Sequence, residues 1–130
     1  MPRTIKNPEG IHPPPGYSHT VVATGSRLAF VAGQVALDLE FELVGGDDLA
    51  AQTRQVMVNL RTALDELGAG WDDVVKATVY TTRPHDYEEI AGAMAEAMGG
   101  AAPPAQVLLG VTSLALATLL VEIELVVSLP

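Results

Sequence analysis

The segment that most constrains the fold is the apolar run of residues 119–127, Leu-Leu-Val-Glu-Ile-Glu-Leu-Val-Val. Its two carboxylates would each cost roughly 2.5–3.5 kcal/mol at the centre of a membrane span, so the run predicts a strand. Side chains alternate between the two faces of a strand. One face is then wholly apolar, and the other places Glu122 and Glu124 between Leu120 and Val126. Such a strand needs cover on both faces, and a partly buried carboxylate needs a partner or a chemical role.

Composition narrows the fold class further. At 130 residues the chain is expected to form one domain, 1–130, with residues 1–18 as an extended, proline-rich lead-in. Its hydrophobic fraction of 48% exceeds what one small core hides, so we expect an interface with other copies. The chain has no cysteine, which excludes disulfides and thiolate chemistry. The first residues carry no apolar leader, which favours a cytoplasmic location.

The charge distribution argues against a nucleic-acid partner, and the spacing of the histidines argues against a metal site. Sixteen acidic residues against seven basic ones give a net charge of −9, and the basic residues are scattered. Nucleic-acid binding draws much of its affinity from clustered Lys and Arg, so no nucleic-acid partner is expected. The histidines His12, His19 and His85 show no metal-binding spacing, so no metal is expected beside Glu122 and Glu124.

Local patterns predict an order of strands and helices. Two helices are indicated by apolar residues at three- and four-residue spacing, one from Asp47 or Asp48 to Gly68 and one from Pro84 to about Met98. The remaining expected elements are a hairpin of residues 20–24 and 28–32 around Gly25-Ser26, a loop at 38–46 with a short strand near Leu43, and strands at 74–82, 106–111 and 119–127. Helices with one apolar stripe each cover one face of a sheet, so the other face is predicted to meet another copy.

Several short motifs stand in one order along the chain. They are Pro15-Gly16-Tyr17-Ser18, Ala32-Gly33-Gln34, residues 52–56 with Asn59-Leu60, Gly68 followed by residues 72–76, Pro103-Pro104-Ala105, and Val121-Glu122-Ile123-Glu124. With these motifs the chain resembles the RidA family, also called the YjgF or L-PSP family of reactive intermediate deaminases. The resemblance implies a chorismate-mutase-like α+β fold: a mixed β-sheet with two helices packed on one face, in a homotrimer with a central barrel. It also implies a ligand cleft at each subunit interface and no cofactor.

The resemblance assigns six candidate site residues. Glu122 and Tyr17 take the catalytic positions, and Gln106, Gly33, Ala32 and Ala91 take the substrate-binding positions. Three of them depart from the family: Gln106 replaces the arginine that grips a substrate carboxylate, Ala91 replaces an asparagine, and Ala32 replaces a serine. A neutral amide cannot match a carboxylate as a guanidinium fork does.

The sequence therefore leaves two functions open. The first is a hydrolase of small enamines or imines with an altered substrate site, in which the loss of arginine at Gln106 argues against 2-aminoacrylate as substrate. The second is a non-catalytic trimer that binds a small metabolite or a protein partner in the same cleft. Endoribonuclease activity, described for some members of the family, is disfavoured by the negative charge.

Overall fold

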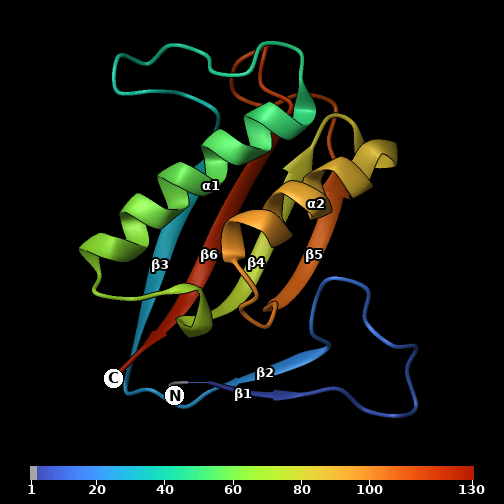
Figure 1. Cartoon of the computed structure of the whole chain (residues 1–130), viewed down its shortest axis with the longest axis vertical. Coiled ribbons are helices and arrows are strands. Elements are labelled where there is room, and N and C mark those ends of the chain that lie inside the picture. Colours follow the sequence, from blue (N-terminus) through green and yellow to red (C-terminus); the bar gives the residue numbers. More distant parts are fainter. Residues whose placement is uncertain (1–2) are drawn as a thin grey trace.

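A four-stranded mixed sheet forms the centre of the molecule in the computed structural model, which describes residues 3–130. The strands lie in the order β3 (Arg27–Gln34), β6 (Val121–Leu129), β4 (Val74–Thr81) and β5 (Ala105–Gly110). The β4–β5 pair is parallel, and the other two pairs are antiparallel. Two helices pack on one face of this sheet (Figure 1), which confirms the predicted α+β class.

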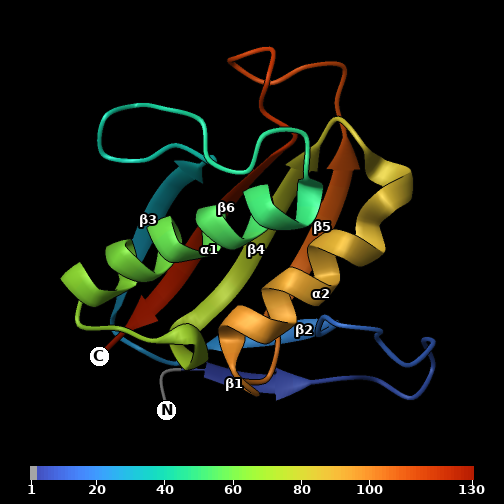
Figure 2. The same cartoon turned by 45° about the horizontal axis from the view of Figure 1, so that its top comes forward.

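The helices end near the predicted glycines and α1 begins at the predicted cap, whereas α2 begins three residues after the predicted Pro84. The helix α1 (Leu49–Glu66) starts at Asp48, whose carboxylate accepts a hydrogen bond from the Ala51 amide at 3.1 Å, and Gly68 follows it in a left-handed conformation. The helix α2 (Tyr87–Met98) follows a 3-10 turn, η2 (Pro84–Asp86), and ends at Gly99 with φ of 60°. In Figures 1 and 2, α1 lies over β3 and β6, and α2 lies over β4 and β5.

The alternation predicted for the C-terminal strand is confirmed. Val121, Ile123 and Val127 are fully buried against the helices, whereas Glu122 and Glu124 are half-buried on the opposite face. Because β6 lies between β3 and β4, it joins the core beneath both helices. The strand begins two residues later than predicted, because the Leu120 amide donates instead to the Gln52 side chain of α1 at 2.9 Å.

The predicted hairpin around Gly25-Ser26 is wrong. β2 (Thr20–Ala23) pairs with β1 (Arg3–Lys6) in a separate two-stranded sheet, and β3 pairs with β6. Gly25 does not have the positive φ that a two-residue hairpin turn needs. Instead it lets two backbones approach: a Cβ on Gly25 would lie 2.1 Å from the Leu129 carbonyl oxygen. The start of the extended lead-in thus forms a strand; its first two residues lie outside the described ones.

The loop between β3 and α1 has the predicted short pairing. Leu37 and Leu43 form an isolated antiparallel bridge. The Asn59 amide of α1 donates to the carbonyls of Val35 and Leu37 at 2.9 and 3.0 Å, which fixes the chain as it leaves β3. Within residues 3–130, no helix is long and apolar enough to cross a bilayer.

Candidate functional site

A cavity of about 350 Å³ lies beside β5 and α2 and brings together three of the candidate residues. Tyr17 comes from the loop before β2, Ala91 from α2 and Gln106 from β5. The other lining residues are Pro15, Gly16, Tyr87, Ile90, Met94, Ala95, Met98, Val107 and Leu108. Their side chains are mainly apolar, and none of the lining residues carries a charge. A ligand here would meet an apolar wall and the polar groups of Tyr17, Tyr87 and Gln106.

Gln106 offers this cavity a free amide. It pairs with Ala77 across the parallel β4–β5 ladder, so its side chain lies on the helix-covered side of the sheet. The amide makes no side-chain hydrogen bond to any residue in the described chain. It can therefore donate to and accept from a ligand, but it cannot balance a carboxylate charge.

Tyr17 is held at the cavity by its neighbours. Its hydroxyl lies 2.8 Å from Nε2 of His12, and the His19 ring packs edge-on against it. Backbone contacts fix the same loop to β5, because the Ser18 amide donates to the Pro104 carbonyl at 3.0 Å. Sequence reasoning considered His12 only as a metal ligand and missed this contact. The signal that could have found it is the rigid run Pro13-Pro14-Pro15 between the two side chains.

The other three candidate residues lie on the opposite face of the sheet. Glu122 pairs with Tyr80 across the β4–β6 ladder, and Tyr80 alternates with the buried Val79 that faces the helices. Gly33 lies against Glu122, and Ala32 is exposed on the neighbouring β3. A single chain therefore does not bring Glu122 to the cavity that holds Gln106.

Gly33 is fitted closely to the Glu122 side chain. A Cβ added to Gly33 would lie 2.0 Å from Oε2 of Glu122 and 2.9 Å from its Cδ, far inside van der Waals contact. Because Gly33 has no side chain, the carboxylate can lie flat against the backbone of β3. The absence of a side chain at Gly33 thus leaves room for the Glu122 carboxylate.

Tyr80 lies beside both carboxylates of β6 and was missed by the sequence reasoning. Its hydroxyl donates to Oε1 of Glu124 at 2.5 Å. This hydrogen bond stabilises the neutral phenol and raises the pKa of Tyr80, and burial and the charges of Glu124 and Glu122 act in the same direction. Glu124 is thereby occupied, whereas the Glu122 side chain has no hydrogen-bond or ion-pair partner among residues 3–130. No group of three His, Asp or Glu side chains within these residues is placed to hold a metal.

The face that carries Glu122 is also apolar and uncovered. Leu28 and Phe30 on β3 are 53% and 75% exposed, and Val107 and Leu109 on β5 are also exposed. By register, Leu28 and Phe30 face the same side as Val126. Leu28 and Phe30 thus form an exposed apolar patch beside Val126, and a patch of this kind is typical of an interaction site. That this face packs against other copies in a homotrimer remains a prediction.

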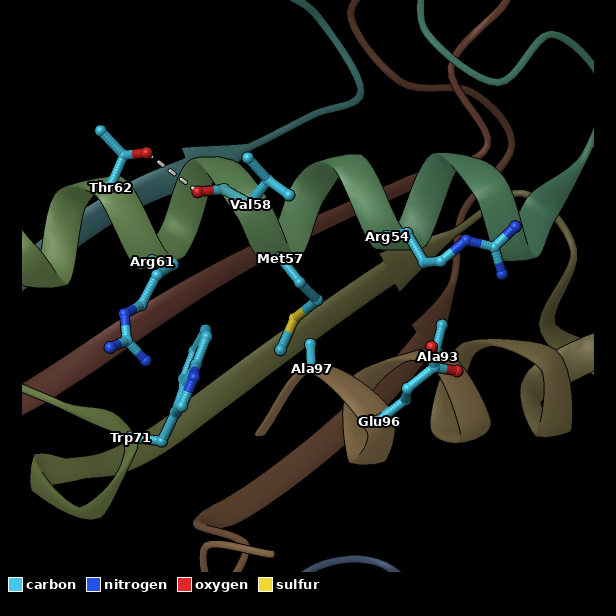
Figure 3. Close-up of a pocket in the computed structure, with 9 residues that line it drawn as sticks. All are labelled: Arg54, Met57, Val58, Arg61, Thr62, Trp71, Ala93, Glu96 and Ala97. Carbon is cyan, nitrogen blue, oxygen red and sulfur yellow. Dashed lines mark hydrogen bonds between the residues drawn. The ribbon is translucent and has the colours of Figure 1, made fainter. Parts of the chain in front are cut away.

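A second, larger hollow of about 430 Å³ lies between α1 and α2 on the outer side of the molecule (Figure 3). None of the six candidate residues lines it. Its floor holds Trp71, from the 3-10 turn η1 (Trp71–Asp73), and Met57 of α1, and Arg54 and Arg61 flank it.

Comparison with known proteins places the chain among relatives along its whole length. The family described as Endoribonuclease L-PSP matches residues 7–129. A RutC family protein of Synechocystis is 33% identical over 129 residues, which is 98% of this chain and 95% of that protein. The 3-aminoacrylate deaminase RutC of Acinetobacter baylyi is 31% identical over 96 residues, covering 74% of this chain and 75% of the enzyme. The crystal structure of YyfB, a conserved Rid family protein of Yersinia pestis, is 41% identical with a TM-score of 0.94, covering 99% of this chain and all of that one.

Proposed function

This chain belongs to the endoribonuclease L-PSP family, the family of the RutC, Rid and YjgF proteins, and from this we propose that it is a Rid-type hydrolase of small enamines or imines. Residues 1–130 act as one Rid domain, and three copies assemble into a homotrimer with a cleft at each seam. The observation that carries the proposal is the division of the candidate residues between the two faces of one sheet. A site that uses Tyr17, Gln106 and Glu122 together must be shared between neighbouring copies.

The exposed apolar face supports such an arrangement. Phe30 and Leu28 lie on the same face as Glu122, so burying them against a second copy brings Glu122 to a seam. β5, which carries Gln106, is an edge strand of the sheet and can lie at the same seam. The trimer therefore combines the cavity of one subunit with the Glu122 of its neighbour.

The chemistry requires few groups. In imine hydrolysis, water adds to the carbon of the C=N bond, and the resulting carbinolamine loses ammonia to leave a carbonyl. The Glu122 carboxylate accepts a proton from the attacking water and passes it to the substrate nitrogen, and the Tyr17 hydroxyl donates a hydrogen bond to that nitrogen. The carbinolamine hydroxyl supplies the second proton with which the nitrogen leaves as ammonia. His12, 2.8 Å from that hydroxyl, orients Tyr17. An enamine first takes a proton on carbon to become the imine.

The cavity selects the substrate by its apolar lining. Ile90, Met94 and Leu108 present hydrocarbon, and Gln106 supplies the only side-chain amide among the lining residues. A charge-assisted hydrogen bond contributes about 1.5–3 kcal/mol, so the loss of an arginine fork weakens carboxylate binding by several tenfold steps. The favoured substrate is consequently an imine with an apolar side chain and no carboxylate, rather than 2-aminoacrylate.

The test is release of ammonia from a panel of imines that differ in charge. We expect the protein to accelerate hydrolysis of neutral apolar imines more than that of 2-aminoacrylate, and Glu122→Ala to abolish the effect. Gln106→Arg should gain activity on 2-aminoacrylate, whereas the control Gln55→Arg, which adds the same charge on α1 outside the cavity, should not. No acceleration of any imine, or an unchanged rate in Glu122→Ala, would contradict the proposal.

A second candidate function is binding without catalysis in the same cleft. It is favoured by the uncharged cavity lining and by Ala91 in place of a polar side chain. Saturable binding of an apolar metabolite without turnover would support it. Ribonuclease activity is disfavoured because the net charge is −9 and the basic residues are dispersed.

A further inference from the structure

The hollow between α1 and α2, here called the interhelical groove, is built by residues that recur on the facing sides of the two helices. Arg54, Met57, Val58 and Arg61 follow one another at helical spacing along α1. From α2 come Ala93, Glu96 and Ala97, whose two alanines leave room between the helices. Figure 3 shows the Met57 side chain pointing from α1 toward Ala97.

The floor of the groove contains a buried hydrogen-bond donor without an acceptor. Trp71 is 7% exposed, and its indole Nε1 has no hydrogen-bond partner in the part of the chain that the structure describes. A buried indole N–H normally finds a partner. Trp71 lines the groove, but Nε1 is itself shielded from solvent, so an acceptor on a ligand seated there reaches it when the indole ring or a neighbouring side chain shifts. The groove thus combines an unpaired N–H with the apolar side chains of Met57, Ala93 and Ala97 and with charged side chains at its ends.

Two arginine side chains line the groove, although the chain has few basic residues. Arg61 lies at the same end of the groove as Trp71, and Arg54 lies at the other end (Figure 3). Arg61 donates through Nε to Asp65 at 3.1 Å, which leaves its two terminal nitrogens unpaired among residues 3–130. Arg54 has no acidic partner within the same residues. These are two of only seven basic residues against sixteen acidic ones.

From these contacts we propose that the interhelical groove is a second ligand site, for a small monocarboxylate with an apolar body. The carboxylate accepts hydrogen bonds from the terminal nitrogens of Arg61 and from the indole N–H of Trp71. The apolar body lies on Met57, Ala93 and Ala97. Glu96, at the opposite end from Arg61, disfavours a ligand with a second carboxylate. The site is separate from the cavity beside Gln106, and it does not depend on the hydrolase proposal.

Trp71 is the only tryptophan of the chain, so it reports on this groove alone. The full-length protein is titrated with phenylacetate, and both the tryptophan fluorescence and the single indole N–H signal in a nitrogen–proton NMR spectrum are followed. We expect saturable changes in both, with the N–H signal moving as the indole gains an acceptor. Phenylacetamide and phenethylamine, which have the same ring without the negative charge, should bind at least tenfold more weakly.

Substitutions of charged residues test the contribution of Arg61 to phenylacetate binding. Arg61→Gln should weaken phenylacetate roughly 10- to 100-fold, which corresponds to one lost charge-assisted contact. Asp65→Asn, which removes the competing carboxylate, should strengthen it, and the control Arg27→Gln on β3 should leave it unchanged. An indole signal that does not move at millimolar phenylacetate, equal binding of phenylacetamide, or an unchanged affinity in Arg61→Gln would each overturn the proposal.

Discussion

Replacing Gly33 by alanine is expected to displace Glu122 while leaving the fold intact. The added Cβ would lie 2.0 Å from Oε2 of Glu122, whereas ordinary contacts begin near 3.4 Å, so the carboxylate must retreat by more than 1 Å. A displacement of about 1 Å in a reacting group can lower the rate by about 100-fold. Gly33 does not have a left-handed backbone, so its conformation is open to alanine. In a strand, alanine raises the free energy of unfolding by about 0.5–1 kcal/mol relative to glycine. The carboxylate is the flexible end of its side chain and can swing aside.

The expected signature of Gly33→Ala is therefore a rate of imine hydrolysis about 100-fold lower with thermal stability unchanged or slightly raised. The assay is ammonia release from the best neutral imine, paired with a thermal melt. The double variant Gly33→Ala/Glu122→Asp, whose carboxylate is one methylene shorter, should recover part of the rate. Gly92→Ala on α2, where a Cβ meets nothing within 4 Å, is the matched control and should keep full activity. A wild-type rate in Gly33→Ala would refute the role given to Glu122.

Two further predictions concern the surroundings of the site. Because the hydrogen bond to Glu124 raises the pKa of Tyr80, its stabilising contribution is complete below about pH 10 and is lost as the pH rises through the folded pKa. Absorbance titration at alkaline pH should show one tyrosine ionising late, and Glu124→Gln should return it toward the others; a titration identical in both proteins would contradict this. Arg3→Met should lower the free energy of unfolding by about 2–4 kcal/mol, because the buried guanidinium donates to the carbonyls of Val74 and Ala102 at 2.5 and 2.7 Å. Denaturant unfolding measures this loss, and a midpoint equal to the wild type would refute it.

Local chemistry made most of the secondary structure predictable. Asp48 and Gly68 mark the ends of α1 because capping is decided by adjacent residues. The two faces of β6 were readable because alternation is a property of the strand itself. The strand limits were shifted by one or two residues, since β5 and β6 begin where contacts with distant segments allow.

Strand partners were less predictable, as Gly25 illustrates. A glycine followed by serine between two β-rich runs is typical of a hairpin turn, and the structure uses this glycine for close packing against Leu129 instead. The partner lies 104 positions away along the chain, and no local pattern reports a contact of that range. The pairing of β1 with β2 was hidden for the same reason.

The candidate residues could be named from the sequence, but their arrangement could not. Tyr17, Ala91 and Gln106 share one cavity, as the family motifs suggested. That Glu122 faces away from Gln106 depends on the register of β4 with both neighbours, which the sequence does not encode locally. His12 and Tyr80 were missed because each acts through one hydrogen bond to a residue that the chain brings close only on folding.

Subunit complementation tests the shared site most directly. Tyr17→Phe damages the cavity half, and Glu122→Gln damages the half on the open sheet face. Each variant alone should be inactive, and an equal mixture, dissociated and reassembled, should regain about one quarter of the wild-type rate, because half of the seams have an intact cavity and half of those have an intact Glu122. If the mixture stays as inactive as its parents while reassembled wild-type protein recovers fully, the two residues do not meet across a seam.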